Sequence, residues 1–208
     1  MLSLIRMYIA IGFRTNMFKV LMLVAVLMVF CAWLASGMSG RQPTSLMLDF
    51  GFSVLRISLC LMSLMWLQEL LGKAIEKRYI SQVLAYPLAK YQVLLANYIA
   101  VAALLLVSLI AVAIVLLLAA HFGSFYEQTT SPNLSFAYVL TWGFIYLDLL
   151  VVLAFALLMT AISTTPQLPL VFGLGFFVIT HAMGPILDYL MLAATAEEAH
   201  KQTITPVL

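Results

Sequence analysis

The chain alternates between long apolar runs and short polar segments, and five of the runs are long enough to cross a membrane. A transmembrane helix needs about 20 mostly apolar residues to span a hydrocarbon core roughly 30 Å thick. The five runs lie at about 17–36, 50–71, 93–120, 136–160 and 168–191. This pattern predicts an all-α integral membrane protein, a helical bundle of five transmembrane helices that forms a single domain over residues 1–208.

The composition favours the same fold class. Hydrophobic residues make up 65% of the chain and charged residues 9%, whereas about a quarter of the residues of soluble proteins are charged. Cys31 and Cys60 lie inside apolar runs and are too few for a disulfide framework, so we expect both to be small core residues. The 12 methionines show no repeated pattern with Cys or His, which favours packing over metal binding.

The two ends of the chain differ in character from the runs between them. Residues 1–16, MLSLIRMYIAIGFRTN, mix apolar positions with Arg6 and Arg14, which predicts an interfacial helix in contact with membrane lipids and retained as part of the protein. Gly173, Gly175 and the Gly184-Pro185 pair in the fifth run predict close packing and a break near its end. The polar tail that follows has too few apolar residues to cross again.

The positions of Lys and Arg predict the orientation. With the N-terminus inside, seven basic residues fall on the inner side and two, Arg41 and Lys201, on the outer side. The seven are Arg6, Arg14, Lys19, Lys73, Lys77, Arg78 and Lys90. Because positive residues concentrate on the cytoplasmic side of a membrane, we expect the N-terminus and segment 68–90 to be cytoplasmic.

Segment 68–90, QELLGKAIEKRYISQVLAYPLAK, is a charged stretch between the second and third apolar runs. Within it, apolar residues recur every three or four positions from Ile75 to Leu88, while Glu76, Lys77 and Arg78 fall mainly on the other face. This periodicity predicts a short amphipathic helix along the inner membrane surface. From the pattern alone, an ordinary interfacial helix that orders a loop and a helix that docks on a partner are both possible interpretations.

The same segment carries a resemblance. It resembles the corresponding segment in the permease subunits of the ABC type-2 transporter family. Between a second and a third span it has an acid, a glycine, a hydrophobic helix, the residues Tyr-Pro-Leu and a basic residue. The matching residues are Glu69, Gly72, Glu76, Val83, Leu84, Pro87, Leu88 and Lys90. The resemblance implies that 76–88 is a coupling helix that sits in a groove of a cytoplasmic ATPase subunit. The implied contact residues are Glu76, Tyr79, Ile80, Val83, Leu84 and Pro87.

The resemblance also implies a function: the membrane-spanning permease subunit of an ATP-driven ABC exporter or flippase in a bacterial inner membrane, working with a second copy or a homologous permease. The chain itself is not expected to be an enzyme or to bind a cofactor, metal or nucleic acid. Its Gly72-Lys73 pair is followed by Ala74 and preceded five positions earlier by Leu67, so it lacks the phosphate-cradling loop. ATP and Mg²⁺ therefore belong to the partner ATPase. Members of the family usually have six spans, which leaves open a sixth span beyond this sequence.

Three ionisable residues, Arg56, Asp148 and His181, lie inside the predicted spans. A charge at the bilayer centre costs at least about 2.5–3.5 kcal/mol, so each should find a partner or water. Arg56 is expected roughly 9 Å inside the outer end of its span at 1.5 Å per residue, where it could pair with Asp148 near His181. The group is either a polar lining of a substrate path or a structural ion pair, and Arg56 could instead reach outward to Asp49.

Two other classes of function compete with transport. A membrane scaffold or assembly factor has no distinguishing pattern in this sequence. An intramembrane lipid-modifying enzyme would need clustered acids at the membrane face, and the acids here are scattered. Copurification of an ATPase separates the transport subunit from both.

The predicted orientation can be tested by cysteine-accessibility labelling. A cysteine introduced at Ser39 should react from the outer side of the membrane, and one introduced at Gln82 should react from the cytoplasmic side. Labelling of both positions from the same side would contradict the five-span topology and the cytoplasmic placement of segment 68–90.

Overall fold

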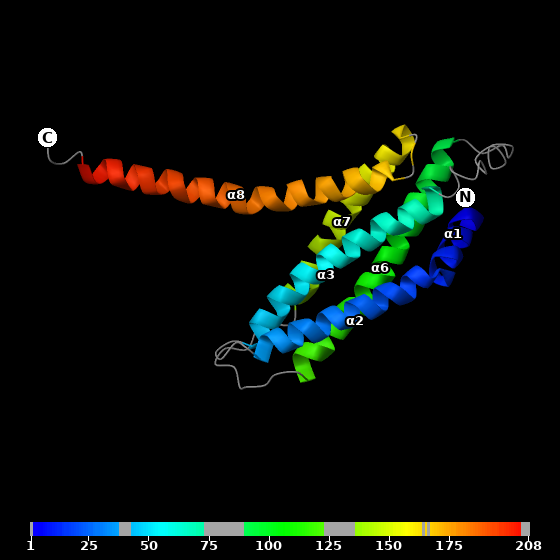
Figure 1. Cartoon of the computed structure of the whole chain (residues 1–208), viewed down its shortest axis with the longest axis horizontal. Coiled ribbons are helices and arrows are strands. Elements are labelled where there is room, and N and C mark those ends of the chain that lie inside the picture. Colours follow the sequence, from blue (N-terminus) through cyan, green and yellow to red (C-terminus); the bar gives the residue numbers. More distant parts are fainter. Residues whose placement is uncertain are drawn as a thin grey trace.

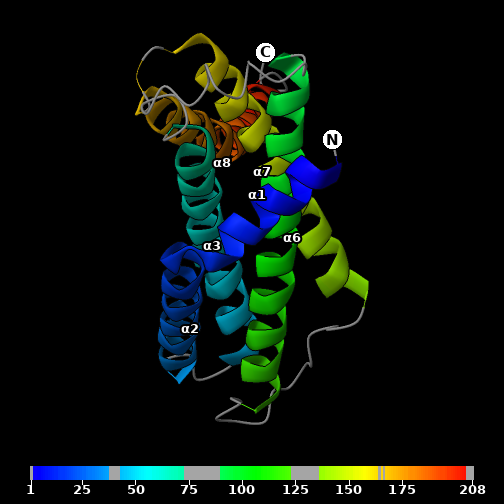
Figure 2. The ribbon, with the colours of Figure 1, turned by 90° about the vertical axis from the view of Figure 1, so that its right-hand side faces the viewer.

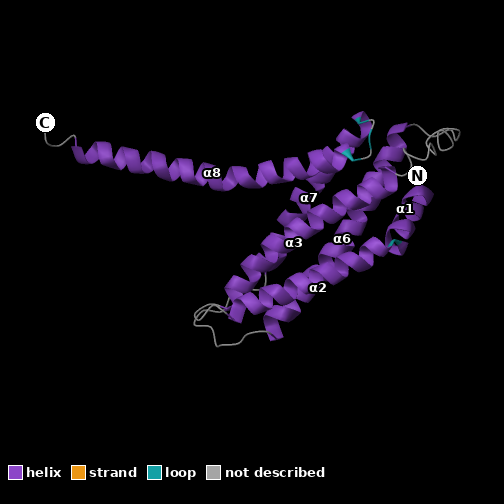
Figure 3. Cartoon of the chain, in the orientation of Figure 1, coloured by secondary structure: helices purple, strands orange, loops and turns teal. Residues whose placement is uncertain are grey.

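The computed structural model of the protein describes residues 2–37, 43–72, 90–122, 136–163, 165 and 167–204, and every element formed by these residues is helical (Figure 3). The elements are α1 (Leu2–Arg14), α2 (Asn16–Gly37), α3 (Pro43–Leu67), the π-helical turn η1 (Gln68–Gly72), α6 (Lys90–Phe122), α7 (Phe136–Ile162) and α8 (Leu168–Ile204).

Five of these helices are long and apolar enough to cross a membrane, as predicted. The candidate spans are Phe18–Gly37, Pro43–Leu70, Gln92–His121, Phe136–Ile162 and Leu168–Leu192. A helix is the natural form for such segments, because hydrocarbon offers no hydrogen bonds and a helix satisfies its own backbone.

Two helix boundaries differ from the predictions. The second span was expected to begin at residue 50, but α3 begins at Pro43, since proline is well accommodated in the first turn of a helix. The fifth span was expected to break near Gly184 and Pro185, but α8 continues through Pro185 to Ile204. A proline inside an apolar helix removes one backbone hydrogen bond without ending the helix when the flanking turns remain intact.

Helix α3 is the centre of the bundle. It packs against α2, α6, α7 and α8, and α2, α3 and α6 run side by side (Figure 1). Its inward face is formed by Leu55, Leu59, Leu64 and Trp66, none of which is more than 2% exposed. The Trp66 ring stacks on Phe18 of α2 with the centroids 6.5 Å apart. Helix α3 therefore contributes buried surface to the contacts with four other helices.

Three tyrosine hydroxyls tie α6 to α7 by donating to backbone carbonyls of the opposite helix. Tyr138 of α7 donates to the carbonyl of Ala113 at 2.6 Å, and Tyr146 of α7 to that of Ala102 at 3.3 Å. In the other direction, Tyr98 of α6 donates to the carbonyl of Leu150 at 3.2 Å. These bonds define the register of two helices that otherwise present apolar surfaces to each other.

The N-terminal helix α1 lies against α6 (Figure 2). Its buried Gly12 contacts the Leu104 side chain, and Tyr8 packs against the core, where burial raises the pKa of its phenol. Leu104 lies 14 residues after the start of α6, which is about 21 Å along the helix. The helix predicted for residues 1–16 is thus present and follows the flank of the bundle; its contact with the lipid interface stays a prediction.

Helix α8 is held at its beginning and then leaves the bundle (Figure 1). Gly173 is buried, and a Cβ atom at this position would lie 2.7 Å from Leu64 of α3 and 3.2 Å from Ala156 of α7. By contrast, no atom of the described residues lies within 4 Å of a Cβ position at Gly175 or Gly184, so the close packing predicted for them does not occur within the described part of the chain. Every residue from 182 to 192 is exposed.

The matched glycines Gly173 and Gly175 give a direct test of this packing. Gly173→Ala should lower the free energy of unfolding by about 1–3 kcal/mol, because the new methyl group collides with Ala156 and the buried Leu64. Gly175→Ala meets nothing and should be neutral or stabilise by up to about 1 kcal/mol through helix propensity. Denaturant unfolding in detergent, followed by tryptophan fluorescence, measures both. Equal effects would show that α8 does not pack through Gly173.

Candidate functional site

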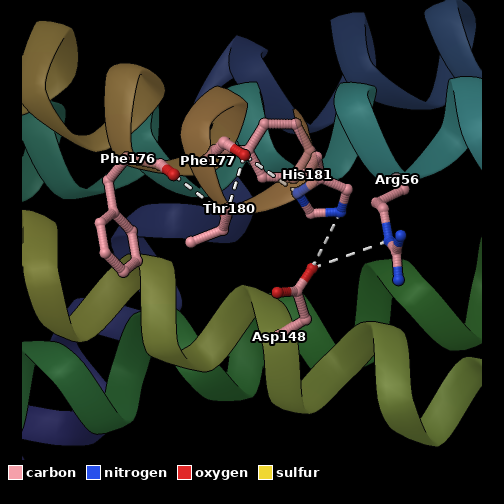
Figure 4. Close-up of polar contacts among 6 residues, drawn as sticks. All are labelled: Arg56, Asp148, Phe176, Phe177, Thr180 and His181. Carbon is pink, nitrogen blue, oxygen red and sulfur yellow. Dashed lines mark hydrogen bonds and ion pairs between the residues drawn. The ribbon is translucent and has the colours of Figure 1, made fainter. Parts of the chain in front are cut away.

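Arg56, Asp148 and His181 meet between three helices (Figure 4). Arg56 lies on α3, Asp148 on α7 and His181 on α8. The Nε atom of Arg56 is 3.7 Å from Oδ2 of Asp148, and Nε2 of His181 is 3.4 Å from the same oxygen. One carboxylate oxygen thus joins three helices that are far apart in the sequence.

All three residues lie near the middle of their spans. Arg56 is 13 residues after Pro43 and 14 before Leu70; Asp148 is 12 after Phe136 and 14 before Ile162; His181 is 13 after Leu168 and 11 before Leu192. Arg56 was expected roughly 9 Å inside the outer end of its span; because α3 starts seven residues earlier than expected, Arg56 lies further from that end of the helix, and its depth in a bilayer stays a prediction. The cluster therefore lies near the middle of three candidate spans, and a charge at the centre of a bilayer is the most costly.

The position of each side chain follows from its helix. Arg56 follows the buried Leu55 and so projects from the edge of the α3 face that packs in the core. The His181 ring is oriented by two contacts with Phe177, one turn earlier on α8. Its Nδ1 is 3.0 Å from the Phe177 carbonyl oxygen, and the two rings lie with centroids 4.2 Å apart.

The cluster is neither enclosed nor fully open. The side chains of Arg56, Asp148 and His181 are 33%, 31% and 29% exposed. The Arg56 Nε and Asp148 Oδ2 atoms are themselves buried and fall short of hydrogen-bond geometry, so the contact is an ion pair. In a low-dielectric surround such a pair offsets part of the cost of removing two charges from water.

Asp148, not Asp49, is the acid that the structure brings within ion-pair distance of Arg56. Two buried residues of the bundle, Cys60 and Asn97, were not considered as site residues from the sequence. Cys60 lies one turn after Arg56 on α3 and is 1% exposed. Asn97 of α6 is completely buried, and neither polar atom of its amide group has a hydrogen-bond partner among the residues that the structure describes. A lone asparagine in an apolar run is the signal that could have identified Asn97.

The predicted ATPase-contact residues Glu76, Tyr79, Ile80, Val83, Leu84 and Pro87 lie outside the described residues. The structure describes the start of the segment, where α3 passes into η1, and this turn contains Glu69 and Gly72 of the motif. Short π-helical turns are rare and often occur at functional sites. The turn marks the transition from the second span to segment 73–89.

A separate groove lies between α6 and α7. It has a volume of about 390 Å³, and its lining includes Leu109, Ala113, Tyr138, Trp142 and Tyr146. Its walls are almost entirely apolar, and the Tyr138 hydroxyl is already donated to Ala113. The groove can accommodate an apolar chain but offers little to orient a polar substrate, so the polar cluster is the stronger candidate site.

The side chains of the cluster can contribute charge, hydrogen bonds and proton transfer. Among the described residues, no group of three or more His, Cys, Asp and Glu side chains could hold a metal ion. An arginine, a carboxylate and an imidazole can hold helices together, contact a charged or polar solute, or carry a proton.

No family model, curated protein or solved structure matches this chain.

The coupling between Arg56 and Asp148 can be measured by a double-mutant cycle. Arg56→Ala and Asp148→Ala should each destabilise the protein, because each change strands one charge in a low dielectric. The double variant should be destabilised by less than the sum of the two, with an interaction free energy of about 0.5–3 kcal/mol. The measurement is denaturant unfolding in detergent.

The matched control replaces Asp49, the other acid considered for Arg56. Arg56→Ala combined with Asp49→Ala should be additive. Additivity in the Arg56–Asp148 cycle as well would mean that the ion pair contributes nothing to stability.

Proposed function

We propose that this chain is the membrane-spanning permease subunit of an ATP-driven exporter or flippase of the ABC type-2 class. It would work as a pair, with a second copy or a homologous permease, and would be coupled to a separate cytoplasmic ATPase that binds ATP and Mg²⁺. The proposed location is a bacterial inner membrane with the N-terminus in the cytoplasm.

The observation that carries the proposal is the charged, amphipathic segment between the second and third spans. Segment 68–90 holds four of the ten Lys and Arg residues in a chain that is 9% charged. It begins in the π-helical turn at the end of α3 and ends at the start of α6. A charged segment between two spans must project into water, and its apolar face then needs a protein or lipid surface to cover it.

The mid-span cluster supports a transport role in a second way. Arg56, Asp148 and His181 leave about a third of each side chain uncovered at the centre of their spans. Ionisable residues at this depth almost always face a bundle interior or a water-filled cavity and mark solute pathways. A path lined by α3, α7 and α8, completed by a second permease, would give the uncovered part of the cluster such a surround.

The polar segments that join the spans bear on the direction of transport. Predicted outer segments such as 37–49 and 121–135 are short, which leaves little room for an outer domain that receives a substrate from a binding protein. An exporter or flippase of lipid-linked, glycan or small hydrophobic cargo fits this arrangement better than a receptor-fed importer.

The decisive experiment concerns the apolar face of the proposed coupling helix. Protein interfaces concentrate their energy in a few buried aromatic and aliphatic anchors, whose truncation costs about 2 kcal/mol or more. Tyr79→Ala with Leu84→Ala should therefore release the ATPase, or uncouple ATP hydrolysis from transport, and leave the membrane bundle folded. The measurement is copurification of ATPase activity with the tagged chain from its native membrane.

Glu76→Ala is the matched control on the same segment. An exposed charge and a helix-dipole contact are each worth about 1 kcal/mol or less, so this variant should keep most of the ATPase. If the wild-type chain brings down no ATPase, the transport proposal fails. If the double variant retains the ATPase at wild-type affinity and full coupled activity, the segment is an interfacial helix and not the coupling element.

A further inference from the structure

Helix α1 has one side that packs against the bundle and one side that is uncovered. Tyr8 and Gly12, one turn apart, lie on the packed side: Tyr8 packs against the core, and Gly12 is buried against α6. Arg6, Ala10 and Arg14 follow at four-residue intervals on the opposite side, and all three are exposed. Two arginines thus lie about 12 Å apart along the outer side of the helix, with a small residue between them.

Exposed apolar side chains border the two arginines. Met7 is 47% exposed, Ile11 42% and Phe13 42%, and they flank the row that contains Arg6 and Arg14. Water disfavours such apolar side chains, and hydrocarbon disfavours the guanidinium groups. The boundary between water and hydrocarbon, where the lipid headgroups lie, accommodates both kinds of side chain.

The corner between α1 and α2 places this surface next to the start of a membrane span. The candidate span of α2, Phe18–Gly37, has 20 residues, which is about 30 Å, the thickness of a hydrocarbon core. The rings of Phe13 and Phe18 meet edge to face across the corner with their centroids 5.3 Å apart. Arg14 lies four residues before this span, and therefore close to one edge of the hydrocarbon core.

The contact with α6 agrees with this position. Helix α6 has 33 residues, or about 50 Å, which exceeds the hydrocarbon core by roughly 20 Å. Leu104, which Gly12 contacts, lies about 21 Å from the start of α6. With the extra length of α6 on the predicted cytoplasmic side, α1 lies at the edge of the hydrocarbon core and not at its centre.

The part of the chain that forms α1 and α2 contains no negative charge to balance the arginines. The first acidic residue of the sequence is Asp49, so Arg6, Arg14 and the exposed Lys19 of α2 lie in a stretch with basic residues only. An anionic phospholipid can supply the opposite charge. A guanidinium group binds a phosphate through two parallel N–H bonds, and basic residues concentrate near anionic leaflets.

We propose that the exposed side of α1 binds the phosphate groups of anionic phospholipids, with Arg6 and Arg14 as the anion-binding residues. Near an anionic membrane surface, each arginine should contribute about fivefold to the preference for anionic over zwitterionic lipid. The proposal rests on the exposure and charge of α1 and on the span of α2, and it does not depend on the transport function proposed above.

The test is photocrosslinking of the full chain in vesicles of phosphatidylcholine and phosphatidylglycerol in equal amounts. In one sample the phosphatidylglycerol carries a photoreactive group on its acyl chain next to the headgroup, and in the other sample the phosphatidylcholine carries it. Mass spectrometry counts the adducts on residues 1–19. The ratio of phosphatidylglycerol to phosphatidylcholine adducts should be well above one. It should fall between about 0.1 and 1 M salt, because screening shortens from about 10 Å to about 3 Å.

Arg6→Gln and Arg14→Gln should each lower this ratio about fivefold, and the double variant should bring it close to one. Lys201→Gln is the matched control, because it removes an equal charge from α8, far along the chain from α1, and should leave the ratio unchanged. Should the double variant fail to fold, the salt dependence of the wild-type ratio and the two single variants decide the question.

Three results would overturn the proposal. Equal adducts from the two lipids in the wild type would mean that α1 contacts lipid without selecting its charge. Adducts from neither lipid would mean that a protein, such as a second copy of the chain, covers α1. An equal fall of the ratio in Lys201→Gln would mean that the net charge of the chain, and not the surface of α1, attracts the anionic lipid.

Discussion

A hydrocarbon surround offers no hydrogen bonds, so every polar group inside it must be satisfied by the protein itself. The backbone meets this requirement by forming helices, and five of them in the described part of the chain are long enough to cross a bilayer. At two helix contacts the side chains meet it by pairing. The α6–α7 contact is built on tyrosine hydroxyls that donate to backbone carbonyls, and the α3–α7–α8 contact on one carboxylate oxygen shared by Arg56 and His181.

Helix α3 connects the packing of the bundle to its polar chemistry. Its buried face supplies the core through Leu55, Leu59, Leu64 and Trp66, while Arg56 projects from the edge of that face toward α7. The same helix ends in the π-helical turn that leads into the charged segment. A movement of α3 would therefore reach both the mid-span cluster and the segment proposed to meet an ATPase. This physical link makes a transport subunit a coherent interpretation of an otherwise apolar chain.

The close contacts of helix α8 that involve Gly173 and His181 lie in its first half. This helix packs closely at Gly173, contacts Asp148 through His181, and is exposed from residue 182 to residue 192. Residues 182–192 are exposed, so the position of this part of α8 depends strongly on the contact at His181.

The sequence by itself determined the fold class, the number of spans and the three ionisable residues that need partners, because hydropathy and charge are properties of each segment alone. The tertiary structure decided which residues meet. It paired Arg56 with Asp148 and not with Asp49, moved the start of α3 to Pro43 and so placed Arg56 at mid-span, and made Gly173 but not Gly175 a contact. These outcomes depend on how each helix is rotated and tilted against its neighbours, which packing across helices sets and the pattern within a single run does not contain.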